Sequence, residues 1–486
     1  MNFRGRTVVV YVLIAMVSTA LITLTAADRW LLREDAKLSG AAGAIDGLTS
    51  LSSKEIDKLN KVFSLVQSKY YTSVEREDMV DGAIQGMLSS LGDPYTSYME
   101  ASDATRFSES IEGSFSGIGA EVTLKDGKVV IMSAMKGSPA ERAGLHAKDV
   151  VLSADGEPLA GLELSEAVAK IRGPKGTKVK LAIQREGVSQ PLELVLIRDD
   201  IDVETIQSEM LENGVGYIEI RQFSVNSAER FAEELQSLEE QGMKALVIDV
   251  RSNPGGVLPV VVTIAQHFIE EGKTIVQVED RKGEREKTLS KGGGKEYPIA
   301  VLINKGSASA SEVLAGALRE SAGAVVVGET SYGKGTVQVS YDKLLGDGSL
   351  VKLTIAKWLT PDGNWVNEKG LEPDKAVSQP DYYTVARIPR DVTLVPESNG
   401  EAVKSLQVML DALGYEPDRK DGYFSPSTAE ALKRFQKDAG ITPTGDGDPK
   451  TTELLEQKLL EKIISGEQDI QLEEAVQAVQ EQLSKS

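Results

Sequence analysis

The first strongly hydrophobic segment of the chain lies near its N-terminus. No charged residue occurs from Thr7 to Ala27, and Arg4 and Arg6 precede this segment. A helix rises about 1.5 Å per residue, so the segment is long enough to cross a bilayer. It is longer than the apolar core of a typical signal peptide, and Trp30 follows it at an interfacial position. We predict an uncleaved membrane anchor within residues 1–33, with a cleaved signal peptide or a buried core helix as alternatives.

Two helices are predicted after a small polar stretch at 34–50, which has the composition of a flexible stalk. The first begins at the capping-box sequence Ser52-Ser53-Lys54-Glu55, and apolar residues at helical spacing give it one hydrophobic face: Ile56, Leu59, Val62, Phe63 and Val66. The second runs near Met79–Leu91 and stops before the turn Gly92-Asp93-Pro94. We therefore predict an N-terminal helical region at 51–112.

The hydrophobic pattern then changes to short strands. Glycine turns separate strands from 113 to 198, with one helix near Ser165–Ile171. From 199 to 380 strands alternate with helices, and three short apolar runs end in glycine-rich or polar loops: Lys244–Asp249, Ala300–Ile303 and Ala324–Val327. A connector leads to a small helical module at 399–460. A last helix within 461–486 has one apolar face, formed by Leu472, Val476, Val479 and Leu483. The predicted fold class is α/β with several domains.

The composition of the 486-residue chain excludes several kinds of site. It contains no cysteine, which rules out disulfides, thiolate zinc sites, iron–sulfur clusters and cysteine nucleophiles. Only His146 and His267 are available, so we expect no multi-histidine metal site, and the serine and lysine reaction considered below needs neither a metal nor a cofactor. The formal charge, 54 − 74 = −20, argues against broad binding to nucleic acid. A hydrolase of this composition needs a general base other than histidine.

Three loops that follow the apolar runs carry the candidate chemistry. The loop Asn304–Glu312 places serines before a helical pattern, where an exposed hydroxyl lies near backbone amides that can stabilise an oxyanion. A serine at this position is also a common helix N-cap. Spacing alone does not choose among three candidates: Ser307, Ser309 and Ser311.

The second loop, Asp249–Gly256, ends in two adjacent glycines. Glycines allow unusual dihedrals and a close backbone approach, which suits an amide directed at a substrate oxygen. The alternative is an ordinary turn after a strand. Asp249 and Arg251 would then form a structural ion pair that supports the loop.

The third loop, Gly328–Gln338, satisfies part of the phosphate-loop pattern. A phosphate loop needs Ser or Thr directly after its lysine and then a helix, whereas Gly335 follows Lys334 and the alternating run Thr336–Tyr341 predicts a strand. Lys334 is instead a candidate base, because burial lowers a lysine pKa and a neutral lysine can deprotonate a serine. Gln338, four residues on, would share a strand face with Lys334 and orient its amine. The alternative is a solvated surface lysine.

The strings DVRSNPGG, NKGSASASEVLAGAL and GETSYGKGTVQ closely resemble those of the carboxyl-terminal processing proteases, the tail-specific serine peptidases of family S41. The resemblance extends over about residues 54–380 and implies a crotonase-like α/β protease core at 199–380. It implies a nucleophile, a general base and a residue that orients the base, in this order: Ser309, Lys334 and Gln338. It also implies oxyanion donors at the backbone amides of Ala310, Gly255 and Gly256.

Residues 113–198 resemble a PDZ domain inserted before the protease core. The segment Phe115–Ala120 resembles the loop that binds a peptide's terminal carboxylate, after which the peptide pairs along a strand edge. This implies contacts at four residues: Ser116, Gly117, Ile118 and Gly119. The segment Ile171–Thr177 also resembles the family. Arg172 within it is a candidate to couple peptide binding to the active site, with a plain turn as the alternative.

Residues 399–460 resemble a small peptidoglycan-binding domain, for example in Asp421-Gly422-Tyr423-Phe424. Ser425 replaces the glycine that usually follows, so the resemblance supports the fold more than glycan binding. The alternative role is assembly. The apolar faces of helices 54–67 and 471–483 either join two protomers, as expected for a homodimer, or pack within one chain.

These features predict a serine endopeptidase of the bacterial cell envelope, membrane-anchored or secreted, that cleaves proteins selected by exposed C-terminal tails. Its expected partners are those proteins, the membrane, peptidoglycan and a second copy of the chain, but not nucleic acid. The resemblance to Bacillus-type relatives implies regulated proteolysis during sporulation. The alternative is an inactive PDZ scaffold bound to the cell wall, which the complete set of catalytic residue types disfavours.

Overall fold

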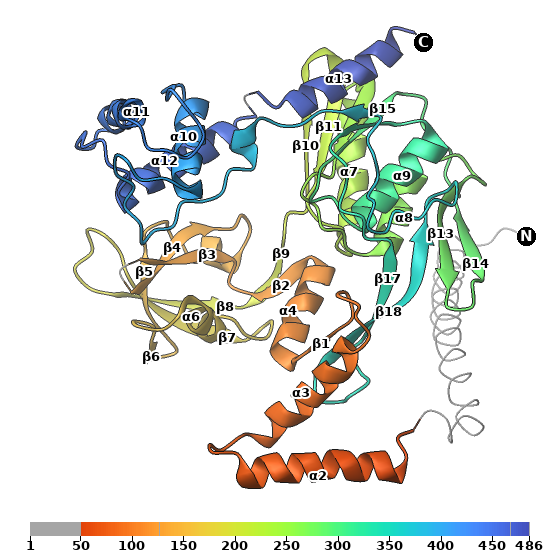
Figure 1. Cartoon of the computed structure of the whole chain (residues 1–486), viewed down its shortest axis with the longest axis horizontal. Coiled ribbons are helices and arrows are strands. Elements are labelled where there is room, and N and C mark those ends of the chain that lie inside the picture. The colour runs from red at the N-terminus through yellow and green to blue at the C-terminus, as the bar shows by residue number, and fades with distance from the viewer. Residues whose placement is uncertain (1–49, 126, 467, 486) are drawn as a thin grey trace, which may run out of the picture. The chain divides into compact units, whose positions relative to one another are not determined.

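The computed structural model describes residues 50–125, 127–466 and 468–485 (Figure 1). The predicted membrane anchor and nearly all of the predicted stalk lie outside these residues, so the anchor stays a prediction. In the part of the chain that is described, no helix is both long and apolar enough to span a membrane. The chain divides into two compact units, the first ending at Ser90 and the second beginning at Leu91.

The first unit contains both predicted helices, α2 (Ser53–Lys69) and α3 (Arg76–Ser89). Ser52 caps α2, and the Glu55 carboxylate accepts the Ser52 N–H at 2.7 Å, which confirms the predicted capping box. No residue of α2 is buried, and Leu59 on its apolar face is 52% exposed. The predicted helix is therefore present, and most of its hydrophobic face is exposed to solvent.

The second unit begins with β1 (Ser97–Met99) and α4 (Ala101–Glu112), followed by a small β domain. Its antiparallel sheet has the strand order β3-β4-β5-β7-β8, with β6 paired to β5 and β3 at one edge. The predicted helix is present as α6 (Leu164–Ile171) and adds Ala167 and Ile171 to the core. The other elements are β2 (Ser114–Gly117), β3 (Ala120–Lys125), β4 (Lys128–Ala134), α5 (Pro139–Arg142), β5 (Val150–Ala154), β6 (Glu157–Pro158), β7 (Lys178–Gln184), β8 (Leu192–Ile197) and β9 (Asp199–Asp202).

The α/β core is built on a six-stranded sheet with the order β10-β11-β12-β15-β16-β19, in which only the β10–β11 pair is antiparallel. Its central strands are buried on both faces, which explains their continuous apolar runs. The elements are β10 (Ile206–Met210), η1 (Glu212–Gly214), β11 (Val215–Ile220), α7 (Ser227–Glu240), β12 (Ala245–Asp249), α8 (Leu258–Gln266), β15 (Ile299–Ile303), α9 (Ala310–Ala322), β16 (Val325–Gly328) and β19 (Lys375–Ala376). The three predicted apolar strands are confirmed as β12, β15 and β16.

A second sheet carries the Lys334 loop. It has the order β1-β18-β13-β14, and β17 pairs with β18. The alternating run after Lys334 forms the strand β17, as predicted. The Lys334 loop is therefore followed by a strand and not by the helix that a phosphate loop requires. The elements are β13 (Thr274–Asp280), β14 (Arg285–Leu289), β17 (Thr336–Tyr341) and β18 (Leu350–Leu359).

The C-terminal module is helical and has its own core, which includes Leu406, Phe424 and Leu432. Its elements are η2 (Asp381–Tyr383), α10 (Glu401–Ala412), α11 (Pro426–Asp438) and α12 (Pro449–Ile464). The last helix, α13 (Ile470–Leu483), does not belong to this core but packs on the sheet of the α/β core. Of the two interpretations of its apolar face, packing within one chain is observed. The predicted α/β multidomain fold class is confirmed.

Candidate active site

Ser309 lies where the loop after β15 meets α9. The other two candidates, Ser307 and Ser311, are fully buried, and their hydroxyls donate to the carbonyls of Val250 (2.7 Å) and Asn253 (2.9 Å). Ser309 is only partly buried, and its hydroxyl donates to none of the residues that the structure describes. Its backbone has φ 53° and ψ −111°, a costly conformation of the kind found at functional turns. Ser309 is therefore the serine whose hydroxyl is available.

Glu312 connects the Ser309 loop to the Lys334 loop. Its side chain is fully buried at the start of α9 and accepts four hydrogen bonds. One oxygen accepts the Ser331 hydroxyl (2.5 Å) and the Gly333 N–H (2.7 Å). The other accepts the backbone N–H groups of Ser309 and Lys334, both at 2.8 Å. Because such charge-assisted bonds are strong, one carboxylate fixes both loops.

The sequence did not predict that Glu312 links these two loops. A signal for it was available, because a glutamate three residues after a serine at a helix start is the spacing of a capping box. This spacing does not show the second set of bonds that Glu312 makes. In the structure the Glu312 carboxylate also accepts the N–H of Lys334, which lies 22 residues further along the chain.

Lys334 is partly buried in the loop between β16 and β17. Its N–H is bonded to the carboxylate described above, and its carbonyl accepts the indole N–H of Trp358 at 2.8 Å. The next residue must be glycine, because a Cβ on Gly335 would lie 2.6 Å from Nε1 of Trp365. The lysine backbone is therefore held from both sides, and the side chain is partly buried, whereas the alternative is a solvated surface lysine.

The surroundings of the Lys334 amine act on its charge in opposite directions. Burial lowers its pKa, the positive charge of Lys352 lowers it further, and the carboxylates of Asp93 and Glu312 oppose this. The Nζ atom also lies 4.9 Å from the centroid of the Tyr95 ring. The net pKa is lowered, as a general base requires. Neither Asp93 nor Tyr95 was singled out as a site residue by the sequence, which shows only a turn there.

Gln338 does not share a strand face with Lys334. The strand β17 begins at Thr336, after the lysine, and its register shifts between Val337 and Gln338, so the expected i, i+4 relationship does not hold. The Gln338 amide nitrogen donates to the hydroxyls of Thr336 (2.8 Å) and Thr354 (3.1 Å). Among these described side chains, no hydrogen bond joins Ser309, Lys334 and Gln338 to one another.

The two glycines of the second loop differ in what their N–H groups do. A Cβ on Gly255 would lie 3.0 Å from the Cβ of Ser309, so this loop contacts the serine. The Gly255 N–H donates to Asn253 Oδ1 at 2.8 Å. The N–H groups of Gly256 and Ala310 have no acceptor within the described ranges. Ala310 is the first residue of α9, where N–H groups lack partners in the helix.

The predicted carboxylate-binding residues form one continuous loop. Ser116 and Gly117 belong to β2, which pairs with β9. Ile118 is buried, and its carbonyl accepts the Ala140 N–H at 2.8 Å. Gly119 has φ 70° and leads into β3 at the sheet edge. An edge strand after such a loop is the arrangement to which a peptide adds as a further strand.

Arg172 ends α6 and joins this domain to α4. Its guanidinium lies 4.4 Å from the centroid of the Phe115 ring and donates to Glu109 at 2.8 Å. The next residue of α4, Ser110, accepts a hydrogen bond at its carbonyl from the Gln222 side chain (3.0 Å). The residue singled out from sequence therefore contacts both its own domain and a helix outside it.

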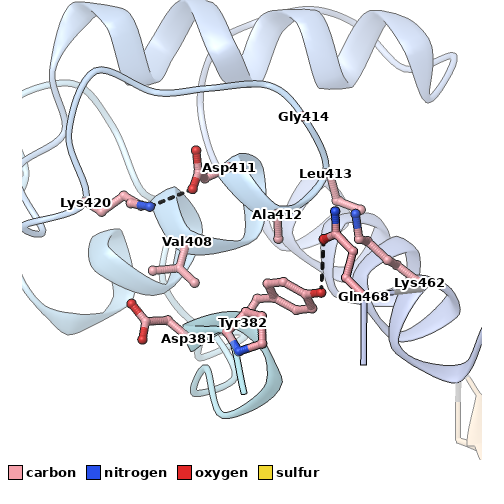
Figure 2. A pocket seen from close by; sticks show the side chains of 11 residues that line it. Asp381, Tyr382, Val408, Asp411, Ala412, Leu413, Gly414, Lys420, Lys462 and Gln468 are labelled. Carbon is pink, nitrogen blue, oxygen red and sulfur yellow. Dashed lines mark hydrogen bonds and ion pairs between the residues drawn. The ribbon is translucent and has the colours of Figure 1, made fainter. Parts of the chain in front are cut away.

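A polar pocket of about 420 Å³ lies in the C-terminal module (Figure 2). Lys420 binds Asp411 at 2.6 Å on one side, and Tyr382 and Gln468 point toward each other on another. None of the residues predicted to act in catalysis lines this pocket. In the described ranges, no group of three histidine, aspartate or glutamate side chains is placed to hold a metal ion.

Family models match four parts of the chain. The models are peptidase family S41 at residues 214–377, a PDZ domain at 130–185, a putative peptidoglycan binding domain at 399–455 and the N-terminal domain of the activating protease CtpB at 22–103. The fold and the matched core therefore define a serine peptidase of family S41 that carries a PDZ domain.

The chain belongs to the carboxy-terminal processing proteases. It is 43% identical to carboxy-terminal processing protease CtpB of Bacillus subtilis, with 92% of this chain and 94% of that protein aligned. It is 41% identical to CtpA of the same organism, over 89% and 92%. Among solved structures, the photosystem II D1 C-terminal processing protease is 28% identical, covers 68% of this chain and 94% of its own, and has a TM-score of 0.40.

Proposed function

We propose that this peptidase cleaves proteins with exposed C-terminal tails, with Ser309 as nucleophile and Lys334 as general base. The observation that carries the proposal is the Glu312 carboxylate, one oxygen of which accepts the backbone N–H groups of both residues at 2.8 Å. This bond pair keeps the two loops at a fixed separation. A serine and lysine pair also suits a chain with only two histidines.

In the proposed reaction, neutral Lys334 takes the Ser309 proton while Oγ bonds to the peptide carbonyl carbon. The resulting oxyanion binds the N–H groups of Gly256 and Ala310, and Gly255 can join them only after its N–H leaves Asn253. Collapse of the tetrahedral intermediate breaks the C–N bond, and Lys334 gives its proton to the leaving amine. Water then hydrolyses the acyl-enzyme by the same proton transfers.

The lysine side chain must move toward Ser309 for this reaction, because in the described residues its Nζ makes no hydrogen bond with the Ser309 hydroxyl and lies 4.9 Å from the Tyr95 centroid. We propose that Gln338 orients the amine in that second position. Its amide nitrogen is already held by two threonine hydroxyls, so its carbonyl oxygen is the group that remains for the lysine. The side chain can therefore act as a fixed acceptor.

Substrate selection is assigned to the PDZ domain. The amides of the loop Ser116–Gly119 would bind the terminal carboxylate, and the peptide would pair with β3. Arg172 is proposed to transmit this binding, because it packs on Phe115 next to that loop and bonds to Glu109 in α4. Loss of ligand-dependent activation in Arg172→Ala is the expected consequence.

A route from α4 to the oxyanion loop supports this coupling. The Ser110 carbonyl of α4 accepts hydrogen bonds from the side chains of Gln222 and Ser224, both at 3.0 Å. The residue between them, Phe223, donates its N–H to the Gly255 carbonyl at 3.1 Å. A displacement of α4 would therefore reach the glycines beside Ser309.

The remaining proposals concern location and assembly. The N-terminal apolar segment and the peptidoglycan-binding domain support a place in the cell envelope, either anchored or secreted. Peptidoglycan is proposed as a ligand of residues 399–460. A homodimer is proposed through α2, because Ile56, Leu59 and Val62 on its apolar face are all exposed.

Labelling with a fluorophosphonate tests the proposed nucleophile. We expect one phosphonyl group per wild-type chain, mapped to Ser309, and labelling about a hundredfold slower in Lys334→Ala because the base is missing. Ser340→Ala, which alters an exposed serine on β17, is the control and should label as wild type. Labelling of Ser309→Ala at the wild-type rate, or no labelling of any chain, would favour the inactive scaffold or another nucleophile.

A further inference from the structure

The last helix of the chain packs on the sheet that carries the active-site loops. Residues of α13 lie against β12, β15 and β16, and Figure 1 shows the helix running along this sheet. Ala475 and Val479 are fully buried in this contact. They cover sheet residues that are themselves fully buried, such as Val247, Ala300 and Leu302. The module at 399–464 is therefore an insertion between two parts of one peptidase core.

The start of α13 also makes a buried ionic contact with the second loop. Asp469 binds Arg251 with both carboxylate oxygens, at 2.9 Å and 2.8 Å, although the two residues are 218 positions apart. Their side chains are 12% and 14% exposed. Burial alone would raise the pKa of Asp469, but the Arg251 guanidinium holds it below its usual value. The same guanidinium binds Asp249 at the end of β12.

The loop after Arg251 has a strained backbone and bonds to residues on both sides of Ser309. Ser252 has φ 56°, an unfavourable conformation for a residue other than glycine. The Asn253 carbonyl accepts the Ala308 N–H at 3.0 Å and the Ser311 hydroxyl at 2.9 Å. A conformation of this kind persists only when its surroundings determine it, and Arg251 is the residue through which α13 supports it.

From these contacts we infer that Asp469 is a positioning residue for the peptidase reaction, acting through Arg251 on the oxyanion loop 250–256. The inference rests on the proposed function of that loop. Asp469 touches no reacting group. Its effect is to hold Arg251 between two carboxylates, so that the loop presents the Gly256 N–H beside Ser309. The C-terminal helix then supports the active site of the peptidase core and does not serve only the helical module that precedes it.

Asp469→Asn in the full chain tests this inference. Asparagine keeps an acceptor for the Leu472 N–H (2.9 Å) at the helix start but loses the charge that binds Arg251. The control is Glu474→Gln, which removes the ion pair of the same helix with Lys375 (2.7 Å). We expect Asp469→Asn to lower kcat about tenfold with KM changed less than about twofold, because only transition-state contacts are lost. Asp469→Glu, which keeps the charge, should recover part of kcat.

Wild-type kcat in Asp469→Asn, or an equal loss of kcat in Glu474→Gln, would overturn the inference. If Asp469→Asn does not fold, Gln471→Met removes only the contact to Arg251 Nη1 (3.1 Å) and the bond to the Val377 carbonyl, and must still lower kcat with KM unchanged. Ser309→Ala separates the two proposals. If it stays active, the proposed function fails. If it is inactive while folded Asp469→Asn is fully active, only the role of Asp469 fails.

Discussion

The Lys334 ammonium lies 4.9 Å from the centroid of the Tyr95 ring. An aromatic face stabilises the charged form of lysine, whereas burial and the charge of Lys352 stabilise the neutral form. The proposed reaction needs the neutral amine. Removal of Tyr95 or of Lys352 should therefore shift the pH dependence of cleavage in opposite directions.

Lys352→Gln is expected to move the pH midpoint of kcat/KM upward. The positive charge of Lys352 lowers the pKa of Lys334, so its loss raises that pKa and more alkali is needed to form the free base. A charge interaction of about 1 kcal/mol corresponds to a shift of about 0.7 pH unit. Lys343→Gln, which alters an exposed lysine, should leave the midpoint unchanged. A downward shift in Lys352→Gln would contradict the account.

Tyr95→Leu is expected to move the same midpoint downward. Loss of the ring contact destabilises the ammonium by about 0.5–2 kcal/mol, which corresponds to about 0.4–1.5 pH units. Burial and a hydrogen bond with Tyr332 raise the pKa of Tyr95 to about 12, so the phenol itself does not titrate near neutral pH. Tyr95→Phe keeps the ring and serves as the control. Equal midpoints in the Leu and Phe variants would show that the ring contact has no such role.

Glu312→Gln should lower kcat by more than the accompanying loss of folding stability explains. The amide NH2 cannot accept the two hydrogen bonds that either Glu312 oxygen now receives. One oxygen accepts the N–H groups of Ser309 and Lys334, and the other accepts the Ser331 hydroxyl and the Gly333 N–H, so the link between the two loops is weakened. We expect kcat to fall about a hundredfold and the free energy of unfolding by about 2 kcal/mol. Urea unfolding and kinetics on one preparation check both values. Exposed Glu372→Gln is the matched control, and comparable kinetics in both variants would refute the role of Glu312.

Arg172 and Glu109 should act as one unit in activation by a C-terminal peptide. Their ion pair measures 2.8 Å and is the contact between the PDZ domain and α4 that we propose to carry the signal. Activation ratios of Arg172→Ala, Glu109→Ala and the double variant are compared in a double-mutant cycle. We expect each single variant to lose most of the activation and the double variant to lose no more. Strict additivity, or normal activation in Arg172→Ala, would exclude this coupling.

The exposed apolar face of α2 predicts a concentration-dependent dimer. Placing glutamate at Leu59 and Val62, which are 52% and 56% exposed, would put charges into an apolar interface. Light scattering should then report the mass of one chain for the double variant and of two chains for the wild type. Lys58→Glu, on the same helix, should leave the dimer intact. A dimeric double variant would show that this face does not join protomers.

The sequence predicted local structure well where the signal was periodic. The capping box at Ser52, the three apolar strands and the strand after Lys334 were all found from spacing and turn chemistry. The relationship expected between Lys334 and Gln338 was not found. Lys334 precedes the strand, so the alternation of strand faces does not extend to it, and the sequence does not show the register shift before Gln338.

Contacts between distant parts of the chain could not be predicted. Glu312 bonds to the Lys334 loop and Asp469 to Arg251, and neither pair has a spacing that a periodic pattern detects. The position of Tyr95 against Lys334 likewise depends on the pairing of β1 with β18. Motifs therefore indicated the candidate active-site loops, whereas the groups that hold these loops and act on the Lys334 charge could be found only in the structure.

The most direct test of the account compares wild type, Ser309→Ala and Lys334→Ala on one unfolded protein substrate with an apolar C-terminus. All three proteins are first matched by melting temperature. The account predicts that the wild type cleaves the substrate and that both variants lose nearly all activity, because one lacks the attacking oxygen and the other lacks its base. Equal cleavage by all three would contradict a serine and lysine mechanism at this site.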